Sequence, residues 1–407
     1  MRGDANTIIR EAIQRVLPDS AVKRALEGKT FPGKVVLVAA GKAAWQMANT
    51  AYECLGNTIS DGIVITKYGH IKGPIGNLSC REAGHPVPDE KGFRATQEAV
   101  NMVSGLQKED TVLFLLSGGG SALFELPAIP GEDLQDITNQ LLASGADIVE
   151  INTIRKRLSK VKGGRFAKLA APAQVFTVVL SDIIGDPLDM IASGPTYPDS
   201  STCVQALEIA KKYSLRLSEQ AQALLRQETP KALSNVTTVV TGSVRQLCQA
   251  AKESCVKLGY KTEILTHSLS CQAKDAGCWL GKIAAENAGK GKKLAFIAGG
   301  ETVVKLTGTG KGGRNQELAL AAAQYIDGIP GTAIFSVGSD GTDGPTDAAG
   351  GYVDHQTAEK LRKEGIDIPL ALKENDSYHA LQRTDGLIIT GPTGTNVNDV
   401  AVALINR

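Results

Sequence analysis

Short runs of β-branched residues recur along the chain, and most of them end in a glycine or small polar residue just before a helical pattern. Repeated strand–turn–helix units of this kind are typical of α/β proteins with mainly parallel sheets. The predicted strands are 35–39, 62–66, 112–116, 175–180, 236–241, 262–265, 294–298, 332–337 and 386–390. Ligands of open α/β sheets bind beyond the carboxyl ends of the strands, so the turns after these runs are the candidate sites.

The length of 407 residues exceeds what one hydrophobic core usually supports, so two domains are expected. The best boundary is the segment ETPKALS (228–234), which follows a glutamine-rich helical pattern and precedes the strand VTTVVTG. We therefore predict an N-terminal domain over residues 1–232 and a C-terminal domain over residues 233–407. Each is expected to be a doubly wound, Rossmann-like α/β domain with a mainly parallel sheet, and a cleft is expected between them.

Composition argues against several classes of partner. The formal net charge of +1 gives no general attraction to nucleic acid or anionic membranes, and no apolar run reaches the ~20 residues of a transmembrane helix. The first residues predict an amphipathic helix from near Asn6, without the apolar core of a signal peptide. The seven cysteines contain no CxxC pair, which favours free thiols in a reducing cytoplasm over a metal site.

The segment GGETVVKLTGTGKGGRNQELALAAA (299–323) brings a glycine-rich loop to the start of an alanine- and leucine-rich helix. Main-chain N–H groups at a helix N-terminus attract anions, and an arginine there adds a bidentate partner. We expect Arg314 to be catalytic. The residues expected to bind substrate or nucleotide around it are Gly310, Lys311, Gly312, Gly313 and Asn315. Taken alone, such a loop is more often a mobile surface segment.

Gly41 and Lys42 form the predicted turn from the first strand into a helix, where a lysine can place its charge over a bound phosphate. The turn is not a Walker A loop, because Val36 and Ala43 stand where that motif needs Gly and Ser or Thr. A second candidate anion nest follows a later strand. It consists of Ser117, Gly118, Gly119, Gly120 and Ser121. A solvated lysine and a purely structural turn are the alternatives at these two places.

Carboxylates follow several of the predicted strands. Asp182 lies at the end of the strand 175–180, and Glu301 and Asp340 occupy comparable positions in the second half of the chain. Mg²⁺ in phosphoryl transfer is usually held by one or two carboxylates plus waters. We therefore predict Asp182, Glu301 and Asp340 as metal ligands and Asp182 as a catalytic residue. Asp186, before Pro187, suits a turn.

Three further patterns support weaker predictions. GTGKGG (308–313) matches the dinucleotide fingerprint GxGxxG, but the acidic residue expected ~20 positions later does not fit. The basic run RKRLSKVKGGRFAK (155–168) is predicted to be a solvated helix face or a positive wall for an anionic substrate, with Gly163-Gly164 as a helix C-cap. His85 lies in a loop that could reach a cleft, and a local hydrogen-bonding role is favoured for it.

Taken together, these segments resemble the glycerate 2-kinase family, also called class II glycerate kinases, whose C-terminal part is the MOFRL domain. The matching stretches run in order over nearly the whole chain: AAGKAA, GHPVPDE, LLSGGGSALFELP, NTIRKRLSKVKGGRFA, SDIIGDPLDMIASGPTYPD, GGETVVKLTGTGKGGRNQELAL, GSDGTDGPTDAAGG and TGPTGTNVND. The last stretch adds Thr393, Gly394 and Asn396 to the residues expected to bind substrate or nucleotide.

The resemblance implies ATP- and Mg²⁺-dependent phosphorylation of D-glycerate to 2-phosphoglycerate, with the critical lysine and arginine of the family at Lys42 and Arg314. The glycine loops would hold glycerate and the ATP phosphates, and which loop serves which ligand is open at this point. Some relatives are called hydroxypyruvate reductases, so an NAD(P)H-linked reductase is the main alternative. A non-catalytic sensor of sugar acids is the third hypothesis, and a homodimer is an open possibility for any of them.

Overall fold

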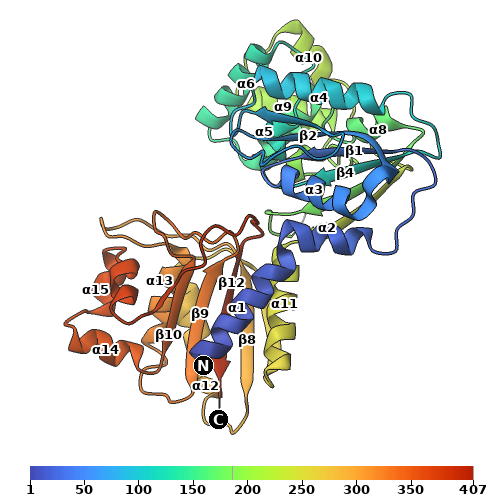
Figure 1. Ribbon diagram of the computed structural model, residues 1–407. Helices are drawn as coiled ribbons and strands as arrows, with labels where there is room; N and C mark the ends of the chain where they lie inside the picture. Colours follow the sequence, from blue (N-terminus) through green and yellow to red (C-terminus); the bar gives the residue numbers. More distant parts are fainter. Residues whose placement is uncertain (186, 407) are drawn as a thin grey trace. The chain divides into compact units, whose positions relative to one another are not determined.

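A computed structural model describes residues 1–185 and 187–406, which form two compact units. The parallel-sheet unit begins at residue 22, runs to residue 180, and resumes for the stretch that ends at residue 241. The mixed-sheet unit contains residues 1–21, residues 181–185 and the chain from residue 242 onward. Both units combine a sheet with helices, as Figure 1 shows, so the predicted α/β class is confirmed.

The sheet of the parallel-sheet unit has the strand order β3-β2-β1-β4-β5-β6 within the described residues. Its strands are β1 (Val35–Ala40), β2 (Ile59–Lys67), β3 (Ser79–Ala83), β4 (Thr111–Leu116), β5 (Gln174–Leu180) and β6 (Val236–Gly242). The pairs formed by the first five strands are all parallel, as predicted. Every residue of β1 and β4 is buried, because strands covered on both faces are continuously apolar.

Helices of this unit connect its strands or extend beyond them. They are α2 (Pro18–Leu26), α3 (Ala44–Leu55), η1 (Gly56–Thr58), α4 (Glu90–Val103), α5 (Gly120–Leu123), α6 (Gly131–Ala143), α7 (Ile148–Leu158), α8 (Arg165–Ala170), η2 (Ile191–Ser193), α9 (Cys203–Lys212) and α10 (Glu219–Leu225). Helices α6, α7, α9 and α10 share a core of their own. The short helix α5 follows β4 directly, so the strand delivers the triglycine loop to the carboxyl edge of the sheet.

The second sheet differs from the prediction, because it is mainly antiparallel. Its strand order is β11-β10-β9-β12-β8-β7 in the part of the chain that is described, and only the β7–β8 pair is parallel. Its strands are β7 (Lys261–Leu269), β8 (Leu294–Gly300), β9 (Thr332–Gly338), β10 (Gly350–Asp354), β11 (Leu387–Ile388) and β12 (Asp399–Ile405). The C-terminal strand β12 enters between β8 and β9 and runs against both of them.

The remaining helices cover both faces of this sheet. They are α1 (Arg2–Val16), α11 (Val244–Lys257), α12 (Ala273–Asn287), α13 (Arg314–Ala323), α14 (Thr357–Lys363), α15 (Ile368–Lys373) and α16 (Ser377–Gln382). Alternate residues of β12 join two different cores, because side chains of a strand alternate between its faces. Val400 and Val402 pack with α1 and α11, whereas Ala401 and Ala403 pack with α12 and α13.

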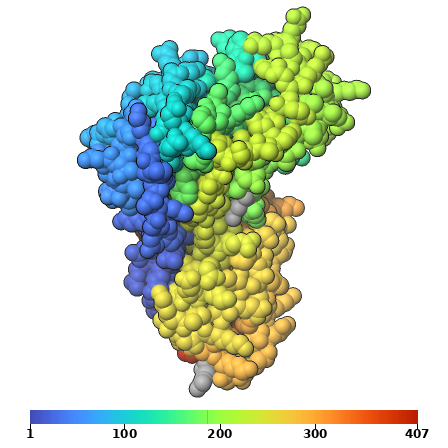
Figure 2. Space-filling view, turned by 90° about the vertical axis from the view of Figure 1, so that its right-hand side faces the viewer, coloured from blue at the N-terminus to red at the C-terminus, as the bar shows by residue number. Residues whose placement is uncertain are grey.

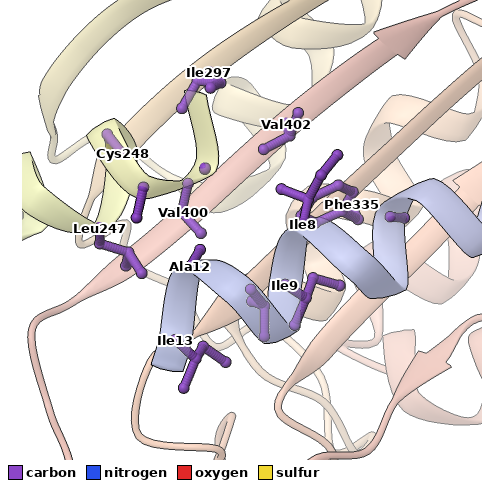
Figure 3. Close-up of a cluster of buried hydrophobic side chains, with 14 of the residues drawn as sticks. Ile8, Ile9, Ala12, Ile13, Leu247, Cys248, Ile297, Phe335, Val400 and Val402 are labelled. Atoms are coloured by element: carbon purple, nitrogen blue, oxygen red, sulfur yellow. The ribbon is translucent and has the colours of Figure 1, made fainter. Parts of the chain in front are cut away.

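The predicted N-terminal helix is confirmed as α1, which begins earlier than expected. It buries Ile8, Ile9, Ala12 and Ile13 against the core of the mixed-sheet unit, where Phe335 and Val402 lie opposite Ile8 (Figure 3). In the space-filling view its blue surface adjoins the yellow surface of α11 (Figure 2). The first residues of the chain therefore belong to the unit formed mostly by the last ones.

The predicted division at residue 232 differs from these compact units, and it stays a prediction. A single cut assigns α1 to the N-terminal half, whereas its apolar stripe is buried in the mixed-sheet unit. The cut also falls before β6, which pairs with β5 in the first sheet.

In the described part of the chain, no helix is both long and apolar enough to cross a membrane.

Candidate active site

The turn after β1 holds Lys42 by its main chain. Gly41 has a φ of +126°, and a β-carbon there would lie 2.2 Å from the Ser117 Oγ, so a larger residue does not fit. The Lys42 N–H donates to the Gly118 carbonyl at 2.9 Å, and the Ala43 N–H donates to the Ser117 hydroxyl at 3.0 Å. The lysine turn and the triglycine loop are therefore joined at the carboxyl edge of the parallel sheet.

The Lys42 carbonyl is held as well, while its side chain is exposed. It accepts hydrogen bonds from the His70 Nδ1 at 3.0 Å and the Thr66 hydroxyl at 3.4 Å. Because the acceptor is a carbonyl, the His70 Nδ1 carries the proton. The main chain around Lys42 is thus fixed on both sides, which limits where its ammonium group can reach.

His85 faces the same loop. A β-carbon at Gly119 would lie 3.0 Å from the His85 Cδ2, 3.1 Å from its Nε2 and 3.2 Å from the Lys42 Cγ. Burial lowers the pKa of His85, and the charges of Lys42 and Lys67 lower it further, so the imidazole is neutral at neutral pH. Sequence reasoning favoured a local role for His85 and found no pattern at His70. Both histidines are distant from Lys42 in sequence, so their proximity to it could not be predicted.

The triglycine loop also serves packing. A β-carbon at Gly120 would lie 2.8 Å from the Ala192 Cβ and 2.9 Å from the Leu116 Cδ1. The Ser121 carbonyl accepts hydrogen bonds from the Arg155 Nη2 at 3.0 Å and the Lys162 Nζ at 2.9 Å. The structure therefore brings together one group of the predicted residues: Gly41, Lys42, Ser117, Gly118, Gly119, Gly120 and Ser121.

The basic run 155–168 is not a solvated helix face. Lys156, Arg157 and Lys162 are buried, at 2%, 0% and 0% exposed. The Lys156 Nζ lies 3.0 Å from the Asp199 Oδ1, and the Arg157 Nη1 lies 3.6 Å from the Asp199 Oδ2. Buried cations need such partners, because an uncompensated charge in the interior is strongly unfavourable.

Lys162 is paired differently, beneath the triglycine loop. Its Nζ lies 3.6 Å from the buried Glu125 Oε2, and burial lowers its pKa to about 8. The predicted C-cap at Gly163-Gly164 is wrong, since α7 already ends at Leu158 and Gly164 precedes α8. Both glycines have a positive φ and donate to the carbonyls of Ser193 and Gly194.

The mixed-sheet unit contains a cavity of about 810 Å³ beside the loop from β8 to α13. It is lined by many of the predicted residues of that unit, namely Glu301, Gly310, Gly312, Gly313, Arg314 and Asp340. The lining also includes the apolar residues Ile184, Val303, Val304 and Leu306.

Arg314, the first residue of α13, is held by two carboxylates. Its Nε lies 2.5 Å from the Asp399 Oδ2, its Nη2 lies 3.0 Å from the Asp399 Oδ1, and its Nη1 lies 3.1 Å from the Glu301 Oε1. Burial raises the pKa of Asp399, and the bidentate contact with Arg314 opposes that shift. Glu301 is 46% exposed and Asp399 only 9%, so Glu301 is the partner that a ligand can displace more easily.

The N-terminus of α13 already carries an internal anion. The Asp343 carboxylate accepts hydrogen bonds from the N–H groups of Asn315 at 3.1 Å and Gln316 at 2.9 Å. Burial raises the pKa of Asp343 to about 6, although these hydrogen bonds oppose the shift. Asn315 is buried and accepts from the Ser336 hydroxyl at 2.6 Å, so its ligand role stays a prediction without support from its position.

The glycines of GTGKGG pack against the chain itself. β-carbons at Gly308, Gly310 and Gly312 would lie 2.4 Å from the Glu374 Cα, 2.5 Å from the Asp376 Cβ and 2.2 Å from the Ser377 Oγ, respectively. The Lys311 N–H donates to the Asp376 Oδ1 at 3.0 Å, and the Lys311 Nζ lies 4.2 Å from the centre of the Tyr378 ring. The glycines of this stretch therefore allow close contact with residues 374–377. In a dinucleotide motif they would instead have to face a pyrophosphate.

The predicted metal ligands lie around Asn398. Its Nδ2 donates to the Asp182 carbonyl at 3.2 Å and to the Glu301 Oε2 at 3.1 Å, while Asp340 lines the cavity. Across residues 1–185 and 187–406, no group of three or more His, Cys, Asp or Glu side chains could hold a metal ion. Two carboxylates with a ligand's oxygens would still suit Mg²⁺. Asp186 lies outside the described residues.

The last predicted loop lies next to Asp340. The Thr393 N–H donates to the Asp340 carbonyl at 3.1 Å, and its hydroxyl donates to the Ser339 carbonyl at 2.5 Å. The Asn396 Oδ1 accepts from the Asn398 N–H at 3.4 Å, and Gly394 has a φ of +84°. Thr393, Gly394 and Asn396 thus support the loop beside the cavity, and their contact with a ligand stays a prediction.

Strand-end loops with a lysine, an arginine and glycine-rich main chain define an α/β protein suited to binding small anions. A domain of unknown function (DUF4147) matches residues 4–226, and the MOFRL family matches residues 294–399. The D-glycerate 2-kinase of Thermotoga maritima is 52% identical over 404 residues, which are 98% of this chain and 97% of that protein. The chain belongs to the glycerate 2-kinase family, class II.

A crystal structure of glycerate kinase from Thermotoga maritima superposes with a TM-score of 0.95 at 51% identity, covering 99% of each chain. A relative from Agrobacterium vitis, 39% identical over 92% of this chain and 87% of its own length, bears the provisional name of a hydroxypyruvate reductase. The two names correspond to the first two hypotheses drawn from the sequence.

Proposed function

We propose that this protein transfers the γ-phosphoryl group of ATP to the 2-hydroxyl of D-glycerate, giving 2-phosphoglycerate and ADP. The observation that carries the proposal is the similarity to a D-glycerate 2-kinase, which extends over nearly the full length of both chains. The geometry supports it, because cations at strand-end loops suit a reaction whose main demand is charge neutralisation.

In this proposal Lys42 contacts the transferred phosphoryl group. Phosphoryl transfer needs positioning and electrostatic stabilisation more than covalent chemistry, and a main chain fixed at both the N–H and the carbonyl of Lys42 provides positioning. The glycine-rich loop beside it can approach an anion closely because it has no β-carbons. His85, neutral and close to the same loop, can donate or accept a hydrogen bond there.

Arg314 is proposed as the second cation of the reaction. A phosphate oxygen can take the place of Glu301, the more exposed of its two partners, while Asp399 keeps the guanidinium oriented. A released Glu301 would then be available for Mg²⁺. A preformed arginine of this kind loses little entropy when it binds an anion.

Mg²⁺ is part of the proposal, with Glu301, Asp340 and Asp182 as the residues that would hold it. Carboxylates and waters are the ligands that Mg²⁺ prefers, and Glu301 and Asp340 line one cavity. The ion would neutralise phosphate charge there. Asp182 is also our candidate for accepting the proton of the glycerate hydroxyl.

The reductase alternative has one observation against it. The glycines that resemble a dinucleotide fingerprint pack against residues 374–377 and Asp343, so that stretch does not form a pyrophosphate cradle. We place the reaction in the cytoplasm, because the free thiols of all seven cysteines favour a reducing compartment. A homodimer is an assembly that remains to be tested.

The test is a pair of assays on the purified protein. With D-glycerate and MgATP we expect ADP release that disappears when Mg²⁺ is chelated, and we expect no turnover of L-glycerate. Coupling to enolase without a mutase identifies the product, because enolase consumes 2-phosphoglycerate directly. Oxidation of NADH with hydroxypyruvate, in the absence of ADP release with glycerate, would establish the reductase instead.

A further inference from the structure

Exposed apolar side chains line part of the cavity in the mixed-sheet unit. Leu306 is 80% exposed and Val303 is 55% exposed, and both belong to the loop between β8 and α13. Large apolar residues left in water beside a cavity are favourable contact surface for a ligand with a flat apolar face.

The cavity is also larger than a three-carbon acid requires. Its volume of about 810 Å³ lies in the upper part of the range for pockets that bury whole cofactors or drug-sized ligands.

The lining of the cavity also carries charged groups. Arg314, Glu301 and Asp340 provide one cation and two carboxylates for a metal-bound polyphosphate. Glu317 adds a fixed hydrogen-bond acceptor, because its buried carboxylate is held by the Asn375 Nδ2 at 3.4 Å and by the Lys274 main chain. A fixed carboxylate at a cavity wall is the group that commonly recognises ribose hydroxyls.

We propose that this cavity is the nucleotide site, with Val303 and Leu306 against the purine base, Glu317 toward the ribose, and Arg314 toward the polyphosphate. The inference rests on the proposed kinase function and assigns the nucleotide to this cavity.

The test measures binding of a fluorescent ADP analogue to the full-length protein and to the variant Val303→Ser/Leu306→Ser. Both positions are exposed, so the substitutions should leave the fold intact. We expect the dissociation constant of the analogue to rise at least about ten-fold, because base contacts are lost. The affinity for inorganic tripolyphosphate, which has neither base nor ribose, should stay unchanged. Leu370→Ser, at a leucine 56% exposed on α15, is the matched control and should have no effect.

Steady-state kinetics separate this assignment from the function itself. In the double variant we expect KM for ATP to rise and KM for D-glycerate to stay constant. Unchanged nucleotide affinity, or a rise confined to KM for glycerate, overturns the assignment even if the kinase activity is present. Nucleotide binding that depends on Val303 and Leu306 in a protein that does not phosphorylate glycerate supports the site and rejects the proposed function.

Discussion

The two cations that the sequence singles out have opposite surroundings. Lys42 has an exposed side chain on a main chain fixed by hydrogen bonds, whereas Arg314 is half-buried and bound by two carboxylates. Removing the Lys42 side chain should therefore lower activity without lowering stability. Removing the Arg314 side chain should lower both, because the buried Asp399 carboxylate would lose its counter-ion.

Replacing Lys42 with alanine should lower kcat at least ~100-fold, as expected when one preorganised transition-state contact is lost. The thermal unfolding midpoint should not change, because the side chain is exposed. Steady-state assays of Lys42→Ala beside Lys108→Ala, at an exposed lysine in the turn before β4, measure the effect. Near-normal kcat in Lys42→Ala would remove Lys42 from the proposed site.

Arg314→Ala should lower both kcat and stability, and Arg314→Lys should separate the two effects. Lysine keeps a charge near Asp399 but cannot reproduce the bidentate contact. We expect Arg314→Lys to keep most of the free energy of unfolding while kcat falls at least ~10-fold. Urea unfolding and steady-state kinetics on both variants test this. If Arg314→Lys keeps normal kcat, Arg314 is a structural partner of Asp399 only.

At the scale of elements, charged groups organise both units. Asp343 caps α13 from a neighbouring loop, and Asp199 compensates the cations of α7. Both carboxylates are buried, so the stability of these helices depends on groups distant in sequence.

Asp343 should make stability depend on pH. Its pKa of about 6 in the folded protein exceeds the ordinary value of 3.8, so the folded state binds more protons between these values. The stability that this group contributes is therefore full below about pH 4 and is lost as pH rises through 6, by about 3 kcal/mol. Urea unfolding gives the free energy of unfolding of wild type and of Asp343→Asn at each pH. The difference between the two curves isolates the contribution of Asp343. A flat difference curve would contradict the raised pKa.

Asp199→Asn should destabilise the protein by about 3–5 kcal/mol, because Lys156 and Arg157 would lose the one fully buried carboxylate that they share and keep only the more exposed Asp189 and Glu228. Glu98→Ala provides the comparison. It breaks the exposed pair with Arg81 and should cost less than about 1 kcal/mol. Urea unfolding of the two variants measures both losses, and equal losses would show that the α7 cations are compensated by other groups.

For the whole molecule, the chain order and the compact units do not coincide. The chain leaves the mixed-sheet unit after α1, enters the parallel-sheet unit, and returns for good after β6. Helix α1 buries an isoleucine-rich stripe against β-strands from the other end of the sequence, including β9 and β12.

Ile8→Ala should therefore destabilise the unit that holds the C-terminus. We expect a loss of about 2–4 kcal/mol from the cavity left in its core. Trp45 lies in the parallel-sheet unit and Trp279 in the mixed-sheet unit, so a Trp45→Phe background reports the latter by fluorescence. The transition of Trp279 should shift, and Ile148→Ala, at a residue 63% exposed, should leave it unchanged. An unchanged transition of Trp279 in Ile8→Ala would contradict the assignment of α1 to this unit.

Sequence patterns alone predicted the α/β class, the parallel first sheet and the strand-end loops around Lys42 and Arg314, because alternating patterns and glycines encode local structure. They did not predict β12, whose run DVAVALI lies between β8 and β9 and makes the second sheet mainly antiparallel. They also misassigned the basic run 155–168, since Asp199 pairs with Lys156 and Arg157, and Glu125 with Lys162, only in the folded chain. The fold was needed to establish strand direction, charge pairing and the place of His70 and His85 beside Lys42, because each depends on contacts between distant segments.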